Sequence, residues 1–254
     1  MRRAAIASIV LAVGTAHADP AIGHVITAPT AWVPTSGSIV ASSGIDHRGD
    51  GDLSGGLGFG GLAVVEIGRD SDVRACLAPP CGTDNRAQPF RLDRASFKIG
   101  AHQDAWFRGQ PALAFGVRTA FSATALDGFS SPKVVEAYVV ASRQISRLKL
   151  HAGAEAIDAS FRDDTGEHRL GTTLRPLGAL EITPPQYPKT TLLGDIAWVP
   201  RFEHTGPTLE WLGGVSVRYQ ALRWGSIELA FRHRESEGLA ASTVLVRVNG
   251  VWEH

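Results

Sequence analysis

The feature that most constrains the fold of this chain is a regular alternation of apolar and polar residues. In residues 148–156, LKLHAGAEA, Leu and Ala fall on one side, while Lys149, His151 and Glu155 fall on the other. A period of two is typical of a β-strand, because successive side chains point to opposite faces of a sheet. Helical periodicity is almost absent from the chain. The sequence therefore predicts an all-β protein built from antiparallel strands.

Twelve segments share this alternation and are predicted to be strands. The connections between them alternate between tight turns, such as Gly60-Gly61, and mostly longer polar stretches. This is the up-and-down pattern of outer-membrane barrels, which have short periplasmic turns and longer external loops. The longer connections are predicted at 70–92, 123–132, 158–167 and 201–208. The predicted strands are 38–47, 53–60, 62–69, 93–101, 111–122, 133–142, 147–157, 168–182, 190–200, 209–220, 226–234 and 241–252.

The polar faces of these strands distinguish a barrel from a soluble β-sandwich, which would also have one apolar face. They are rich in Gly and Ala, which suit the crowded interior of a modest barrel, and their charges are balanced. The residues predicted to form a lumen-facing polar network are Glu66, Lys98, Arg118, Glu136, Lys149, His151, Glu155, Arg169, Arg175, Glu181, Asp195, Glu210, Arg218, Glu228, Arg232 and Arg247.

These charges allow two kinds of lumen. They can line a narrow polar conduit and set its selectivity, or they can pair and fill the interior. The number of Arg and Glu side chains favours the filled barrel. Residues 19–37, with Trp32, are predicted to be an N-terminal periplasmic or plug segment. This segment can enter the lumen or lie on the periplasmic side as a partner-binding strand.

Aromatic residues gather near the tight-turn ends of the predicted strands, as in the interfacial girdle of a membrane barrel. Closure of the sheet would also remove its two unpaired edges, with strand 241–252 pairing with strand 38–47. The predicted fold is a single antiparallel up-and-down transmembrane β-barrel of about 12 strands. The predicted interface aromatics are Trp106, Phe107, Tyr187, Tyr219, Trp224 and Trp252.

The first residues predict export. A basic head and an apolar run precede Ala16-His17-Ala18, a small-x-small cleavage site, so residues 1–18 match a secretory signal peptide. Residues 38–254 would then form the barrel, and the expected location is the outer membrane. The two cysteines, Cys76 and Cys81, flank a Pro-Pro turn. Because exported proteins fold in an oxidising compartment, we expect them to form a disulfide.

Candidate catalytic and metal-binding residues are few. His151 and Glu155 lie about 13 Å apart along one strand, so either would need partners from other strands. The chain has no G-x-S-x-G and no H-E-x-x-H motif, and DHRGDGDL, residues 46–53, lacks the terminal Glu of a calcium loop. We predict no catalytic residue, no metal, no cofactor and no enzymatic activity. The 25 basic and 25 acidic residues give no argument for nucleic-acid binding.

Three stretches resemble a known family. Ala28-Pro29-Thr30-Ala31 and Ser36-Gly37-Ser38 precede the first strand, residues 54–68 form a strand, a Gly turn and a strand with a Glu, and residues 213–232 form a late hairpin. They resemble the YjbH-like outer-membrane barrels associated with exopolysaccharide biosynthesis. The chain differs from many barrels at its end, where Glu253-His254 follows the last aromatic residue. The resemblance implies an outer-membrane location and an envelope polysaccharide role, and it supplies no catalytic residues.

The expected function is that of a non-enzymatic outer-membrane barrel of the Gram-negative envelope, which assists exopolysaccharide export or envelope assembly. Two alternatives stay open: a passive porin for small solutes, and an outer-membrane lipid or polysaccharide hydrolase. The expected partners are outer-membrane lipid, the barrel-assembly machinery and polysaccharide.

Overall fold

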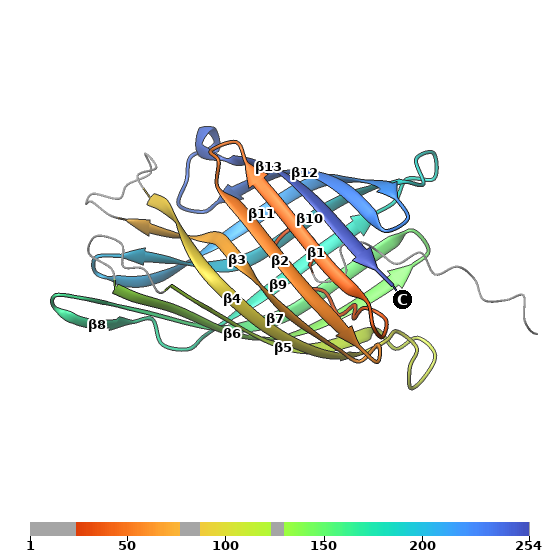
Figure 1. Ribbon diagram of the computed structural model, residues 1–254, viewed down its shortest axis with the longest axis horizontal. Helices are drawn as coiled ribbons and strands as arrows, with labels where there is room; N and C mark the ends of the chain where they lie inside the picture. The colour runs from red at the N-terminus through yellow and green to blue at the C-terminus, as the bar shows by residue number, and fades with distance from the viewer. Residues whose placement is uncertain (1–23, 77–86, 123–129, 254) are drawn as a thin grey trace, which may run out of the picture.

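The strands of the computed structural model form a closed barrel (Figure 1). The structure describes residues 24–76, 87–122 and 130–253. The predicted signal peptide and Cys81 lie outside them, and so does the predicted disulfide. The strands are β1 (Ile39–Asp46), β2 (Gly51–Phe59), β3 (Ala63–Cys76), β4 (Ala87–Ala101), β5 (Ala112–Phe121), β6 (Ser130–Ile145), β7 (Leu148–Asp163), β8 (Gly166–Arg169), β9 (Thr173–Ile182), β10 (Thr190–Glu203), β11 (Gly206–Leu222), β12 (Gly225–Arg234) and β13 (Thr243–Trp252).

Antiparallel pairing between neighbours closes the barrel. β13 pairs with β1 from Ile39↔Trp252 to Asp46↔Leu245. β8 and β9 both pair with β7 and share one place in the wall, so the closed sheet has twelve positions. The predicted twelve-stranded antiparallel barrel and the predicted pairing of its first and last strands are confirmed.

Several strands are longer at the loop end than the sequence indicates. β7 and β8 are separated only by residues 164–165, and β10 and β11 only by 204–205, so the predicted loops 158–167 and 201–208 are mostly strand. Asp163 turns the first hairpin by accepting the backbone N–H of Thr165 at 2.8 Å. The prediction is wrong because a hairpin that projects beyond an apolar wall needs no apolar face, so polar residues do not mark where a strand ends.

The outer surface of the barrel is apolar. Leu53, Ile67 and Leu174 point outward and are 61%, 66% and 69% exposed. Contiguous apolar surfaces of this extent are rare on water-soluble monomers, whereas a transmembrane barrel presents such a band to lipid. Within the described parts of the chain, no helix is long and apolar enough to cross a bilayer.

The interior is filled in three layers. Residues 24–37, which we call the plug, enter from the tight-turn end, and Val25, Ile26 and Ala31 are buried. Ion pairs occupy the middle layer. An apolar cluster lies at the loop end, and its buried members are Val73, Ala75, Phe90, Leu92, Ala120, Val134, Ile157, Ala159, Phe161 and Phe202.

The apolar cluster forms where two strands meet across the lumen. The register of β3 shifts between Asp70 and Val73, and its last residues then pair in parallel with β10 at Arg74↔Arg201 and Ala75↔Phe202. A bulge bends a strand and re-aims its side chains. This contact between β3 and β10, which we call the cross-bridge, covers the ion pairs from the loop side.

Candidate lumenal site

Asp195 on β10 holds the first turn of the plug. Its Oδ2 atom accepts hydrogen bonds from the backbone N–H groups of Ile26 at 3.0 Å, Thr27 at 2.6 Å and Ala28 at 2.8 Å. Three successive N–H groups that point at one oxygen form an anion-binding nest. The wall therefore binds the plug through a charge that satisfies three partly buried backbone donors.

Cationic side chains bind the carbonyl groups of the plug. Hydrogen bonds from charged donors are shorter and stronger than neutral ones. Because these bonds end on the backbone, they fix the path of the plug without depending on its side chains. They join Lys98 Nζ to the oxygens of Trp32 at 2.8 Å and Thr30 at 3.3 Å, Arg218 Nη2 to the oxygen of Val25 at 2.9 Å, and Arg247 Nη1 to the oxygen of Ile26 at 2.9 Å.

A buried polar chain connects the plug to β6, β7 and β9. The backbone N–H of Ala31 donates to Ser142 Oγ at 2.8 Å, and Ser142 Oγ lies 2.7 Å from His151 Nδ1. His151 Nε2 lies 3.1 Å from Glu181 Oε1. His151 thus finds its partners on the two neighbouring strands and not in Glu155. The order hydroxyl, imidazole, carboxylate is also that of serine hydrolases.

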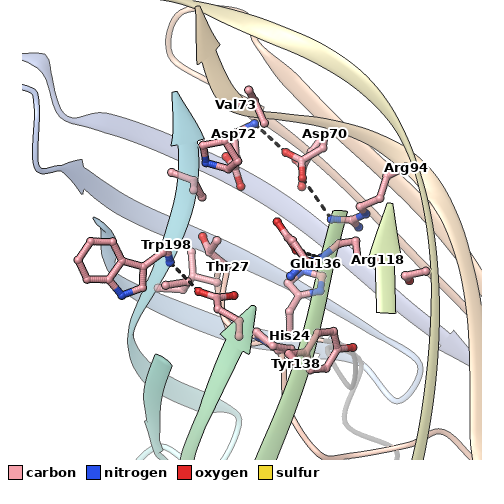
Figure 2. A pocket seen from close by; sticks show the side chains of 18 of the residues that line it. His24, Thr27, Asp70, Asp72, Val73, Arg94, Arg118, Glu136, Tyr138 and Trp198 are labelled. Atoms are coloured by element: carbon pink, nitrogen blue, oxygen red, sulfur yellow. Dashed lines mark hydrogen bonds and ion pairs between the residues drawn. The ribbon is translucent and has the colours of Figure 1, made fainter. Parts of the chain in front are cut away.

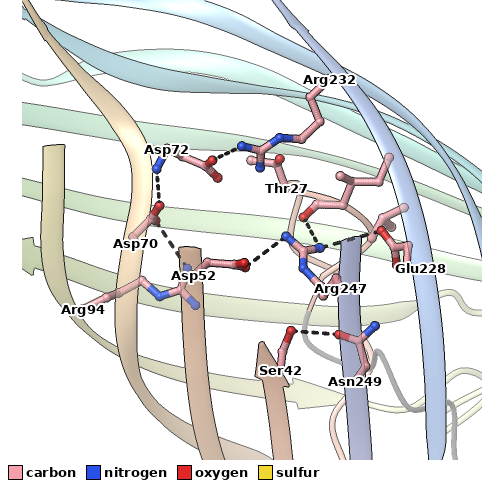
Figure 3. Close-up of polar contacts among 12 residues, drawn as sticks. Thr27, Ser42, Asp52, Asp70, Asp72, Arg94, Glu228, Arg232, Arg247 and Asn249 are labelled. Atoms are coloured by element: carbon pink, nitrogen blue, oxygen red, sulfur yellow. Dashed lines mark hydrogen bonds and ion pairs between the residues drawn. The ribbon is translucent and has the colours of Figure 1, made fainter. Parts of the chain in front are cut away.

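Arginines on β11, β12 and β13 pair with carboxylates in the lumen. Figure 3 shows the pairs of Arg232 and Arg247. Glu228 is 0% exposed and lies 2.9 Å from Arg218 Nε and 3.8 Å from Arg247 Nη1. Arg247 also lies 3.2 Å from Asp52 on β2. The contact between Arg247 and Asp52 joins β13 to β2 across β1, so one network links β11, β12, β13 and β2. Further pairs are Arg94–Asp70, Arg118–Glu136, Arg232–Asp72 and Arg234–Glu210.

A small cavity lies between the plug and this network (Figure 2). Its volume is about 60 Å³, and its wall includes Glu66, Arg118, Glu136, Tyr138 and Trp198. A space of this size holds only a few water molecules. A larger solute would therefore need the plug or the wall to move.

The other predicted lumenal residues lie on the inner faces of their strands. Lys149 pairs with Glu181 at 3.8 Å, and Glu66 accepts the Ser96 hydroxyl at 3.2 Å. The buried ones are Lys98, His151, Glu155, Glu181, Glu210, Arg218, Glu228, Arg232 and Arg247. The partly buried ones are Glu66, Arg118, Glu136, Lys149, Arg175 and Asp195.

Arg169 is the exception, and its predicted lumenal position is wrong. Its side chain is 65% exposed on the outer face, where Nε donates to Asp158 Oδ2 at 2.9 Å. Residues 170–172 separate β8 from β9, and Gly171 has a φ of +74°. Odd-numbered residues face outward before this break and inward after it. A change of phase by one residue moves every following side chain to the other face.

Several partners of the predicted lumenal charges lie outside the predicted polar network. Asp70 and Asp72 fall in a predicted loop, and Ser142 is an ordinary hydroxyl at a strand end. The alternation itself could have identified Asp70. It lies four residues after Glu66 and therefore on the same inner face of β3, one residue beyond the predicted end of that strand. Asp52, Arg94 and Arg234 are missed for the same reason, since they lie at or beyond predicted strand ends.

The six predicted interface aromatics are all exposed at the tight-turn end of the wall. Trp224 and Trp252 stack on each other with ring centroids 5.2 Å apart. Amphipathic rings of this kind are enriched where a barrel meets the membrane–water interface.

No family model and no curated protein matches the chain. Outer membrane phospholipase A from Escherichia coli aligns with a TM-score of 0.42 and 10% identity, over 87% of this chain and 96% of that one. The translocator domain of autotransporter NalP from Neisseria meningitidis aligns with a TM-score of 0.35 and 10% identity, over 85% of this chain and 86% of that one. A loop-deletion mutant of OmpT, an outer membrane protein of Vibrio cholerae, aligns with a TM-score of 0.41 and 13% identity over 80% of this chain. The aligned part of this chain spans 63% of the length of that protein. Values this low support no functional assignment.

Proposed function

We propose that this chain is a non-enzymatic outer-membrane β-barrel of a Gram-negative envelope, closed at rest by its plug and apolar cluster. The observation that carries the proposal is an apolar outer wall around a lumen filled with ion pairs and buried backbone. Such a wall fits lipid, and such a lumen fits a protein that does not pass solutes freely.

Two measurements test this proposal. Membrane fractionation with heat-modifiable gel mobility is expected to place the chain in the outer membrane. Planar bilayers containing the purified protein are expected to show no steady current. A fully soluble chain without a mobility shift would contradict the membrane location, and steady ohmic currents would support the passive porin instead.

A role in exopolysaccharide export or assembly is part of the proposal and rests on the resemblance to YjbH-like barrels. It is tested by deleting the coding sequence and measuring secreted polysaccharide. Wild-type chain supplied in trans is expected to restore the yield. An unchanged yield in the deletion strain would remove the polysaccharide role and leave the closed barrel intact.

A lipid or polysaccharide hydrolase is the second candidate, favoured by the chain Ser142–His151–Glu181. The plug opposes it, because Ser142 is buried and its Oγ atom accepts the Ala31 N–H. We expect a fluorophosphonate probe to leave the wild-type protein unlabelled. Labelling that disappears in S142A, or turnover that H151A abolishes with the fold intact, would establish the hydrolase.

A further inference from the structure

The wall of the barrel is interrupted between β9 and β10. Their ladder runs from Ile182↔Leu192 to Gly178↔Ile196 and then ends, although both strands continue. If the register continued, Pro176 would face Trp198 and Leu174 would face Pro200. A proline has no N–H to donate to a ladder, so each of these pairs contains a residue that weakens it.

Side chains close this interruption, which we call the seam (residues 173–177 and 197–200). The backbone N–H of Trp198 donates to Glu155 Oε1 at 2.9 Å, and the Trp198 indole N–H donates to the Pro176 carbonyl at 3.0 Å. The Arg175 guanidinium lies 4.9 Å from the Trp198 ring centroid. These two backbone groups are thus satisfied by side chains that can rotate, whereas the partners in a strand ladder have no such freedom.

The seam lies at the height of the apolar outer surface. Trp198 follows Thr190, the first residue of β10, by eight positions. At about 3.3 Å per residue and a tilt of about 40°, that is roughly 20 Å along the barrel axis, inside an apolar band of about 25 Å. Leu174, Leu180 and Ile196 are exposed outward beside it. Lipid chains would therefore contact the outside of the seam.

Two different environments lie behind the seam. Glu155, Ala197, Trp198 and Pro200 form part of the wall of the charged cavity. Figure 2 shows Trp198 at the edge of this cavity. Trp198 and Leu170 also pack against the apolar cluster. A molecule that entered here would contact polar groups on one side and apolar groups on the other. An amphiphile, with a polar head and an apolar chain, fits these two environments.

We propose that the seam is a lateral portal through which a single-chain amphiphile passes between the bilayer and the lumen. Its polar head enters the charged cavity, which widens when Trp198 leaves its wall, and its alkyl chain lies against the apolar cluster. The side chains of Trp198 and Arg175 close the portal. Pro176 and Pro200 prevent the β9–β10 hydrogen-bond ladder from extending across it. The portal rests on the proposed function, because it needs a membrane around the barrel.

The experiment measures access from the bilayer to a cysteine just inside the seam. A197C, in a C76S/C81S background, is placed in phosphatidylcholine vesicles and treated with dodecyl maleimide. Ala197 is 3% exposed and lines the cavity, while Ala230, the site of the matched control A230C, is 1% exposed on β12 and packs against the plug. Heat-modifiable mobility is measured first, so that a failure to enter the membrane is recorded separately.

Adding W198A is expected to raise the labelling rate of A197C about tenfold and leave that of A230C unchanged, because only the seam opens. P176V restores an N–H group and is expected to lower the A197C rate below that of the parent. R175Q provides a second opening variant if W198A does not fold. Equal acceleration at both cysteines, or none at A197C in folded W198A or R175Q, would overturn the portal.

Discussion

Glu228 shows at the scale of one residue how the lumen depends on paired charge. It is fully buried between Arg218 and Arg247. E228Q would leave two buried guanidinium groups without their shared counter-charge, and breaking a buried ion pair costs about 3–5 kcal/mol. We expect urea unfolding in detergent micelles to show a loss of this size.

The matched control for E228Q is E167Q. Glu167 pairs with Arg162 at 3.4 Å, but both side chains are more than half exposed, at 52% and 67%. Exposed pairs contribute at most about 1 kcal/mol. Equal losses in the two variants would mean that the lumenal network is hydrated like the surface.

Asp104 gives a pH-dependent prediction in the turn between β4 and β5. The backbone N–H of Gly109 donates to its carboxylate at 2.5 Å, and this bond holds the pKa of Asp104 below its ordinary value. The contribution to the turn is complete above the ordinary pKa and is lost as pH falls through the folded value. We expect the NMR amide signal of Gly109 to shift in one acid step below the ordinary Asp pKa. That step should be absent in D104N, and a step at the ordinary pKa would contradict the bond.

The sequence predicts which face a residue occupies better than it predicts its partner. Alternation places Glu181 and Arg218 inside, because strand parity is local. It fails for Arg169, because the phase change at Gly171 leaves no mark in the apolar pattern. Partners such as Ser142 for His151 depend on how neighbouring strands align, which a single strand does not encode.

At the scale of elements, the plug makes the clearest prediction. Asp195 accepts three of its backbone N–H groups, so D195A leaves three partly buried donors unpaired, at up to about 1–3 kcal/mol each. We expect D195A to show transient current openings in planar bilayers, where the wild-type protein shows none, because the first turn of the plug detaches. D158A removes an outward carboxylate and should stay silent.

A silent D195A with an unchanged unfolding midpoint would contradict the role given to Asp195. If the unfolding midpoint of D195A falls but its planar bilayers show no openings, the cationic side chains hold the plug on their own. R247Q combined with D195A would then be the variant expected to open.

Strands were predictable where the outer wall of the barrel is apolar and unpredictable where it is polar. β5 and β12 lie within one residue of their predicted bounds, because they alternate over most of their length. The single strand predicted at 168–182 is divided into β8 and β9, because the chain changes phase at residues 170–172. The ends of β7 and β10 project beyond the apolar wall, where polar hairpins form equally well. The plug has no period at all, since its backbone is bound by side chains of other strands.

At the scale of the whole molecule, closure between β1 and β13 makes a direct prediction. Ser43 and Val248 face each other across that junction and both point outward. S43C/V248C, in a C76S/C81S background, is expected to form a disulfide under mild oxidation and to slow unfolding in micelles. S43C/V215C, whose second site lies outward on β11, is the control. Cross-linking of the control, or none in the facing pair, would contradict the closed barrel.

The alternation, the turn lengths and the removal of sheet edges were enough to predict a closed barrel and its strand count. The cross-bridge between β3 and β10 was beyond such reasoning. It joins strands that are far apart around the barrel, and it requires a bulge after Asp70 that the sequence does not mark.

The plug also constrains the order in which the chain can fold. It precedes β1, yet Arg247 on β13 binds the Ile26 carbonyl across a sequence separation of 221 residues. Contacts between such distant residues form slowly, because a long loop must close before they contribute. A plug that already lies against the inner face when β1 meets β13 needs no later insertion through the tight-turn end. On that route, the last step of folding joins β1 to β13 around the plug.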